Sequence, residues 1–176
     1  WGDLPCHGDV FHAEKSLTEL SSFLANRARA CTVARQKIEH QYEQIERSCK
    51  RQTLGRKLYL ARREEHKAVT LAADVQVLVD WMCRDVLALA GPGLIERQEL
   101  YDFIVAELQR CQGDCPHRLT PVVEMLRHQR TRLLSFVEVL QAKFCDIADR
   151  FAVPLATVQA LCELEGRSEE HTSELQ

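Results

Sequence analysis

The chain has 176 residues and a formal net charge of −3, with 45% hydrophobic and 28% charged residues. This length suits a single domain, and with only 7 Gly and 5 Pro the composition favours long helices over a strand-rich fold. No apolar run approaches the roughly 20 residues of a membrane-spanning helix, and no basic, apolar leader indicates secretion, so we expect a cytoplasmic protein without a membrane partner.

The two ends of the chain predict a fragment with an added tail. The chain begins at Trp1 without an initiator Met, which indicates a truncated reading frame. Residues 167–176, RSEEHTSELQ, look like the in-frame translation of a sequencing-library adapter, and we interpret them as a non-native tail that packs against nothing. A native polar tail is the alternative. Because the tail carries one Arg and three Glu, residues 1–166 have a net charge of −1.

The first predicted elements are a short extended segment and a long helix. Residues 1–12, WGDLPCHGDVFH, are expected to be non-helical because Gly and Pro recur in them. Apolar residues then recur three or four positions apart from Leu17 to Cys49, which predicts an amphipathic helix of about 40 residues. A helix of this length needs a partner helix to cover its apolar side.

The next segment supplies that partner. Apolar residues from Leu58 to Leu89 keep a seven-residue repeat, interrupted by Glu65 at one seam position, as an antiparallel helical hairpin requires. We predict a hairpin over residues 13–90, with its turn at Thr53–Gly55. The Gly-Pro-Gly sequence at Gly91–Gly93 should stop the second helix.

Three shorter helical segments are expected downstream. A helix at about residues 94–110 should bury Leu100, Phe103, Ile104 and Leu108. After the loop QGDCPH, Thr120 and Pro121 match the N-cap and the first turn of a fourth helix that runs toward Phe151. Pro154 should break it, before a last helix over residues 155–163. No segment alternates with period two, so the predicted fold class is all-α.

The eight cysteines are expected to be reduced and buried, because they follow apolar rows and no secretory signal is present. One cluster is different: Cys111, Cys115 and His117 form a C-x3-C-x-H pattern. Zinc would need a fourth ligand, and no second cysteine pair follows at ligand spacing. A turn that ends a helix is the alternative interpretation.

Charge is unevenly distributed along the chain. The segment from Arg27 to Lys67 has a net charge of +7, and the segment from Ala68 to Leu108 has a net charge of −5. Two hairpin helices that attract each other and present solvated faces would explain this. A cluster of cations that tracks DNA phosphates would explain it as well. The DNA-contacting candidates are Arg35, Lys37, Arg47, Lys50, Arg51, Arg56, Lys57, Arg62 and Arg63.

A second pattern associated with DNA lies at residues 146–162, DIADRFAVPLATVQALC. Its apolar spacing is typical of a helix-turn-helix motif, in which the second helix reads a major groove. That second helix, however, carries no Lys or Arg and is followed by Glu163 and Glu165, which phosphates would repel. Packing within the helical bundle is the alternative.

The opening motif GDVFHAEKSL places Asp9 and His12 three residues apart, where the extended segment meets the first long helix. The motif resembles the junction in bacterial DDE transposases, whose RNase H-like core runs from a D-x-x-H motif into a helical insertion. The downstream segments CPHRLTPVVEMLRHQRTRLLSFVEVL and IADRFAVP resemble that insertion as well. The resemblance covers nearly all of residues 1–166.

The resemblance implies roles for both residues. Asp9 would be the second of three metal-binding carboxylates, and His12 a neighbour that supports the site. Residues 1–12 would end a strand of the catalytic core, and residues 13–166 would form the insertion. The first Asp would precede Trp1 and the Glu would follow Gly166, so this chain alone is expected to be inactive. The complete parent would use Mg²⁺ to cut and join DNA.

The implied partners are transposon DNA and further copies of the parent in a homo-oligomer, with no small-molecule substrate. The rival hypothesis is a helical coiled-coil interaction or regulatory module with a degenerate helix-turn-helix at residues 146–162. In that case Asp9 would be dispensable.

Overall fold

The computed structural model describes residues 8–45, 48–162 and 164. It contains four long helices: α1 (Gly8–Glu43), α2 (Ser48–Trp81), α3 (Leu94–Cys111) and α4 (Pro116–Phe151). A π-helical turn, η1 (Met82–Val86), extends α2, and a 3-10 turn, η2 (Gln112–Asp114), links α3 to α4. A last helical stretch covers residues 155–162. None of the described residues forms a strand, and the all-α prediction is confirmed.

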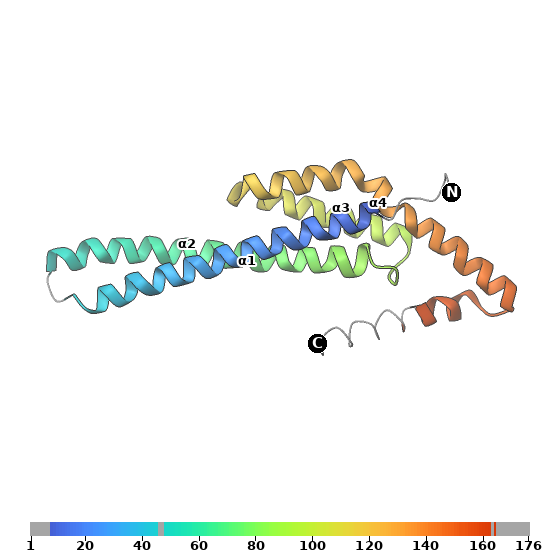
Figure 1. Cartoon of the computed structure of the whole chain (residues 1–176), viewed down its shortest axis with the longest axis horizontal. Helices are drawn as coiled ribbons and strands as arrows, with labels where there is room; N and C mark the ends of the chain where they lie inside the picture. Colours follow the sequence, from blue (N-terminus) through green and yellow to red (C-terminus); the bar gives the residue numbers. More distant parts are fainter. Residues whose placement is uncertain (1–7, 46–47, 163, 165–176) are drawn as a thin grey trace.

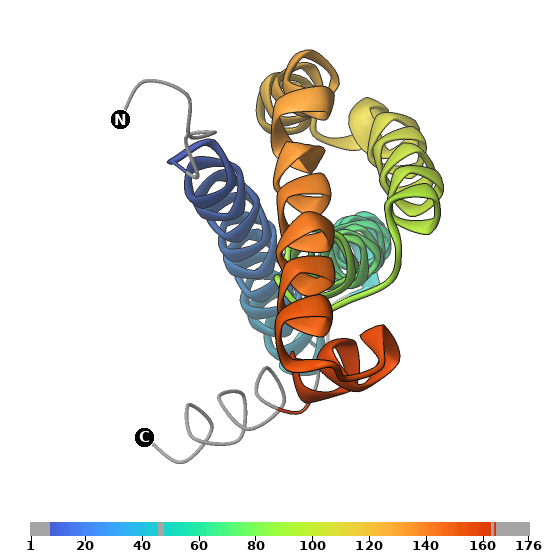
Figure 2. The same cartoon turned by 90° about the vertical axis from the view of Figure 1, so that its right-hand side faces the viewer.

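α1 and α2 form the predicted antiparallel hairpin. Figure 1 shows that the half of the hairpin that contains its turn projects beyond α3 and α4. We call this projecting half the arm and define it as residues 31–45 and 48–67. The other half of the hairpin packs with α3 and α4 into the body of the molecule. In Figure 2, α4 runs between α1 and α3.

The predicted turn at Thr53–Gly55 is wrong, because α1 ends at Glu43 and α2 begins at Ser48. Gly55 lies inside α2, where an added Cβ atom would stand 3.4 Å from the Tyr42 ring. This glycine therefore belongs to a helix rather than to a turn, and a Cβ atom at its position would make an ordinary van der Waals contact. The apolar spacing in the sequence continues past the end of α1 to Cys49. The turn predicted from this spacing therefore lies too far along the chain.

The prediction of an extended segment over residues 1–12 is also wrong for residues 8–12, which are helical. α1 begins at Gly8, so Asp9 and His12 lie in helix, while residues 1–7 lie outside the described residues. Val10 packs against the core and Ala13 is fully buried, which extends the helix toward its N-terminus. Asp9 in the first turn also complements the positive end of the helix dipole.

The core lies in the body, where all four helices meet. Tyr101 of α3 is buried, and its hydroxyl donates a hydrogen bond to the carbonyl oxygen of Leu126 in α4, 2.6 Å away. Leu100 packs against the core, and Ile104 and Leu108 are buried as predicted, but Phe103 is 47% exposed. The fully buried core side chains include Leu17, Leu24, Val75, Met82, Val86, Ile104, Leu108, Leu119, Leu126 and Leu133.

The boundaries of the later helices confirm part of the prediction. α3 and the end of α4 at Phe151 agree with it. α4 begins earlier than expected, because Pro116 rather than Pro121 occupies the first turn, and Pro121 lies inside the helix. Either proline is compatible with an early helical position, and the prediction of a start at Thr120 and Pro121 is wrong.

Candidate nucleic-acid interface

A polar layer holds the two helices of the arm together. Arg35 of α1 donates two hydrogen bonds to the carboxylate of Glu65 in α2, from Nε to Oε2 at 2.8 Å and from Nη2 to Oε1 at 3.1 Å. Arg35 also pairs with Glu39, which accepts a second bond from Arg62 at 2.5 Å. The interruption of the seam at Glu65 is therefore the centre of an ion-pair network between α1 and α2.

This network has a clear electrostatic signature. The hydrogen bond from Arg35 lowers the pKa of the Glu65 carboxyl group, and those from Arg62 and Arg35 lower the pKa of Glu39. Glu65 and Glu39 in turn raise the pKa of the Arg35 guanidinium. Two of the predicted DNA-contacting cations, Arg35 and Arg62, thus have their charges balanced within the arm.

The other cations of the arm face solvent. In the part of the chain that the structure describes, no carboxylate lies within ion-pair distance of them. Arg51 lies 5.1 Å above the Tyr42 ring, which orders its guanidinium near the tip of the arm. Arg47 lies outside the described residues. The exposed cations without a described ion pair are Lys37, Lys50, Arg51, Arg56, Lys57, Arg63 and Lys67.

The arrangement suits contacts with a polyanion. At about 1.5 Å per residue, the stretch of α2 that carries these cations is roughly 25 Å long, a length that can follow several consecutive phosphates. Base stacking would have little support, because Tyr59 is the one strongly exposed aromatic side chain among the described residues of the arm. The arm therefore offers phosphate contacts rather than base recognition.

Asp9 lies at the opposite end of α1. Its Oδ2 atom is 2.8 Å from Nη2 of Arg132 in α4, and the pair joins the start of α1 to the body. His12 is exposed, and its ring packs edge-on against Phe11 at 5.8 Å. Within the described ranges, no group of three or more His, Cys, Asp or Glu side chains could hold a metal ion. In the described residues Asp9 thus pairs with a cation and belongs to no potential metal-binding cluster.

The Cys111, Cys115 and His117 cluster has a packing role. Cys115 is 1% exposed, and its Sγ atom lies 3.9 Å from Nε2 of His117, whose ring packs against Phe23. Burial raises the pKa of the Cys111 thiol. The cysteines whose side chains are described form no disulfide. Among them only Cys115 is buried, Cys145 is exposed and the others are half-buried, so the expectation of burial is wrong for most of them. The cluster lies where α3 ends and α4 begins, in agreement with the interpretation as a turn that ends a helix.

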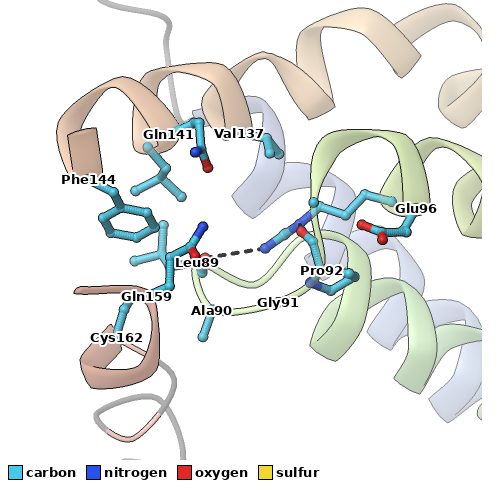
Figure 3. Close-up of a pocket in the computed structure, with 13 residues that line it drawn as sticks. Leu89, Ala90, Gly91, Pro92, Glu96, Val137, Gln141, Phe144, Gln159 and Cys162 are labelled. Carbon is cyan, nitrogen blue, oxygen red and sulfur yellow. Dashed lines mark hydrogen bonds between the residues drawn. The ribbon is translucent and has the colours of Figure 1, made fainter. Parts of the chain in front are cut away.

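Sequence reasoning missed a buried cation in α3. Arg97 is 2% exposed and lines a cavity of about 290 Å³ between the loop after η1, the second half of α4 and the last helical stretch (Figure 3). Its position in the same helical row as Tyr101, Ile104 and Leu108 was the available signal. The Arg97 side chain donates hydrogen bonds to backbone carbonyl groups, so we assign it a structural role.

The segment at 146–162 does fold as two helices around a turn. α4 ends at Phe151, Ala152 adopts a left-handed conformation with φ of 51°, and residues 155–162 form the second helix. Val158 is buried, while Leu161 is 61% exposed. The second helix presents no Lys or Arg with which to contact phosphates, so the arm remains the stronger candidate interface.

Comparisons with protein-family models, curated proteins and solved structures found no match for this chain. None of the helices in the described residues is both long enough and apolar enough to cross a membrane.

Proposed function

We propose that this chain is part of a DNA transposase of the DDE type, in which the arm contacts transposon DNA in the cytoplasm. The observation that carries this proposal is the projecting arm with exposed cations that have no described carboxylate partner. A protein stabilised only by attraction between hairpin helices would pair these charges across the seam. Instead the seam uses Arg35 and Arg62, and the remaining cations stay exposed.

Charge reversal in the arm tests DNA binding. We expect Lys37→Glu/Lys50→Glu/Lys57→Glu to weaken binding to a mixed-sequence duplex by about tenfold or more, because three phosphate contacts are lost. The salt dependence should also become shallower, with the slope of log K against log salt concentration falling by about 3. Fluorescence anisotropy at several salt concentrations measures both quantities, and circular dichroism checks that helicity is retained.

A matched control reverses three cations outside the arm, in Lys15→Glu/Lys143→Glu/Arg150→Glu. This variant should bind DNA more tightly than the arm variant, although it carries the same net charge. Equal losses in the two variants would show that binding depends on overall charge, and the helical interaction or regulatory module would then be the better hypothesis.

Asp9 is tested in the longer parent, where it would be the second of three carboxylates that hold Mg²⁺. Asp9→Ala should stop strand cleavage with little loss of DNA binding, because it removes a metal ligand and no phosphate contact. The control Arg132→Ala removes the partner of Asp9 and keeps the carboxylate. Cleavage that persists in Asp9→Ala would reject the role assigned to the D-x-x-H motif.

A further inference from the structure

The side of α2 that faces away from α1 carries a continuous exposed row. Its members are three or four residues apart, which keeps them on one side of a helix. All are exposed, with Tyr59 66%, Val77 47% and Trp81 41% exposed, and Trp81 at the end of the row also contacts Phe103 of α3. We call this set the outer row: Arg56, Tyr59, Arg63, Lys67, Thr70, Asp74, Val77 and Trp81.

Charges and aromatic groups are segregated along the outer row. Cations occupy its first half, at Arg56, Arg63 and Lys67, while Asp74 lies in the second half. Thr70 is the midpoint: Tyr59 lies eleven residues before it and Trp81 eleven residues after it. In a second α2 helix running in the opposite direction, Asp74 would meet Lys67 and Trp81 would meet Tyr59. Arg63 would meet the apolar Val77, and Arg56 would lie near Arg84, so the charge complementarity rests on the central pair.

We propose that two copies of this chain pair through their outer rows as an antiparallel, two-fold dimer centred on Thr70. Lys67 of each copy then lies opposite Asp74 of the other, because the two residues are nearly equidistant from the centre. Both contacts form at once, as an isologous interface requires. A parallel pair would instead place cations against cations along the first half of the row.

The aromatic residues support the same register. Trp81 packs against Phe103 of α3 with ring centroids 6.3 Å apart, and both rings remain more than 40% exposed. Tyr59 of the second copy would lie opposite Trp81 and cover this pair. Exposed aromatic side chains that gain such a contact contribute strongly to association.

The outer row shares Arg56, Arg63 and Lys67 with the exposed cations of the arm, but the dimer is measured without DNA. Lys37, Lys50 and Lys57, which the DNA-binding test changes, lie outside the outer row. Failure of either proposal therefore leaves the other open to its own test.

Sedimentation equilibrium of the full chain at low salt, from about 1 to 300 µM, tests the dimer. We expect a reversible monomer–dimer equilibrium. Lys67→Asp and Asp74→Lys should each raise the dissociation constant by about tenfold, because each places like charges opposite each other twice in the dimer. The exchange variant Lys67→Asp/Asp74→Lys should return to within about threefold of the original value.

Two controls make the same charge changes on α2 outside the row. Lys57→Asp and Glu64→Lys should leave the dissociation constant unchanged. A monomer at every concentration would overturn the proposal, and so would a dimer that tolerates both single changes or is not restored by the exchange.

A benzophenone amino acid in place of Thr70 tests the register. Cross-links located by mass spectrometry should join position 70 to residues 66–74 of the second copy. Cross-links to α3 or α4 of the second copy, or to distant parts of α2, would contradict the antiparallel arrangement.

Discussion

Arg97 shows how one residue closes the end of a helix. Its guanidinium donates hydrogen bonds to the carbonyl oxygens of Val86 and Ala88, both at 2.6 Å, and its Nε atom donates to Pro92 at 2.7 Å. Carbonyl groups at a helix C-terminus have no partner within the helix, and a cation there is favourable. The Phe136 ring lies 5.5 Å from the guanidinium carbon and completes its enclosure.

The neighbouring glycine is part of the same arrangement. A Cβ atom on Gly91 would lie 2.7 Å from Nη2 of Arg97 and 3.0 Å from the carbonyl oxygen of Asp85. The backbone can therefore wrap closely around the guanidinium only with glycine at this position. Burial lowers the pKa of Arg97, since desolvation disfavours the charged form.

We predict that Arg97→Met lowers the free energy of unfolding by about 3 kcal/mol, because several buried carbonyl groups lose their donor at once. Arg97→Lys should fall between Arg97→Met and the original chain, since an ammonium group cannot reach all of these acceptors. Urea unfolding followed by circular dichroism measures both. Arg84→Met, at an exposed position, is the control, and an equal effect at both positions would exclude the capping role.

At the scale of the element, the arm combines apolar packing with the ion-pair layer of Arg35, Glu39, Glu65 and Arg62. A charged layer in a helical seam fixes which residues face each other, because a shifted register would leave the charges unpaired. Leu58 and Ala68 are buried in α2 on either side of the layer. The layer thus specifies the alignment of α1 and α2 where the body no longer supports them.

This layer makes arm stability depend on acid pH. Glutamate in the unfolded chain titrates near pH 4.3, and the folded pKa values of Glu39 and Glu65 are lower. The contribution of Glu39 and Glu65 to the stability of the folded arm is therefore complete above about pH 4.3. It is lost as the pH falls through their pKa values in the folded chain. We predict that Glu39→Gln/Glu65→Gln lowers the melting temperature at pH 7 and that this difference shrinks toward pH 3.

Thermal melts by circular dichroism between pH 7 and pH 3 measure the effect. Glu64→Gln is the matched control, because this neighbouring carboxylate is exposed and has no ion pair among the described residues. A difference between the double variant and the original chain that stays constant down to pH 3 would contradict the assigned role of the layer.

At the scale of the whole molecule, the hairpin separates two regions of different character. The body holds the four-helix core, while the arm is a pair of helices that projects from it (Figure 1). The arm carries exposed cations. α2 spans both regions, so its charge changes sign along its length: its cations lie at or before Lys67, and Asp74 and Asp80 lie after it. The proposed DNA contacts and the proposed dimer both use this polarity.

The sequence by itself determined the all-α class, the hairpin and the extent of α3. Apolar residues that recur three or four positions apart over many residues form one side of a helix, and this spacing does not fit a strand. The sequence also located the basic segment. It misplaced the turn at Gly55 and the start of α4, because Gly and Pro are compatible with more than one role. The prediction that the tail, residues 167–176, packs against nothing concerns residues outside the described part of the chain.

Only the tertiary structure decided which charges are balanced. Arg35 and Arg63 are both basic residues of the same segment, yet Arg35 is held between two carboxylates and Arg63 has none within ion-pair distance in the described chain. The partners of Arg97 were likewise visible only in the tertiary structure, because they are backbone carbonyl groups up to eleven residues away. Periodicity reports which side of a helix is apolar, whereas the partner of a charge depends on how distant segments are brought together.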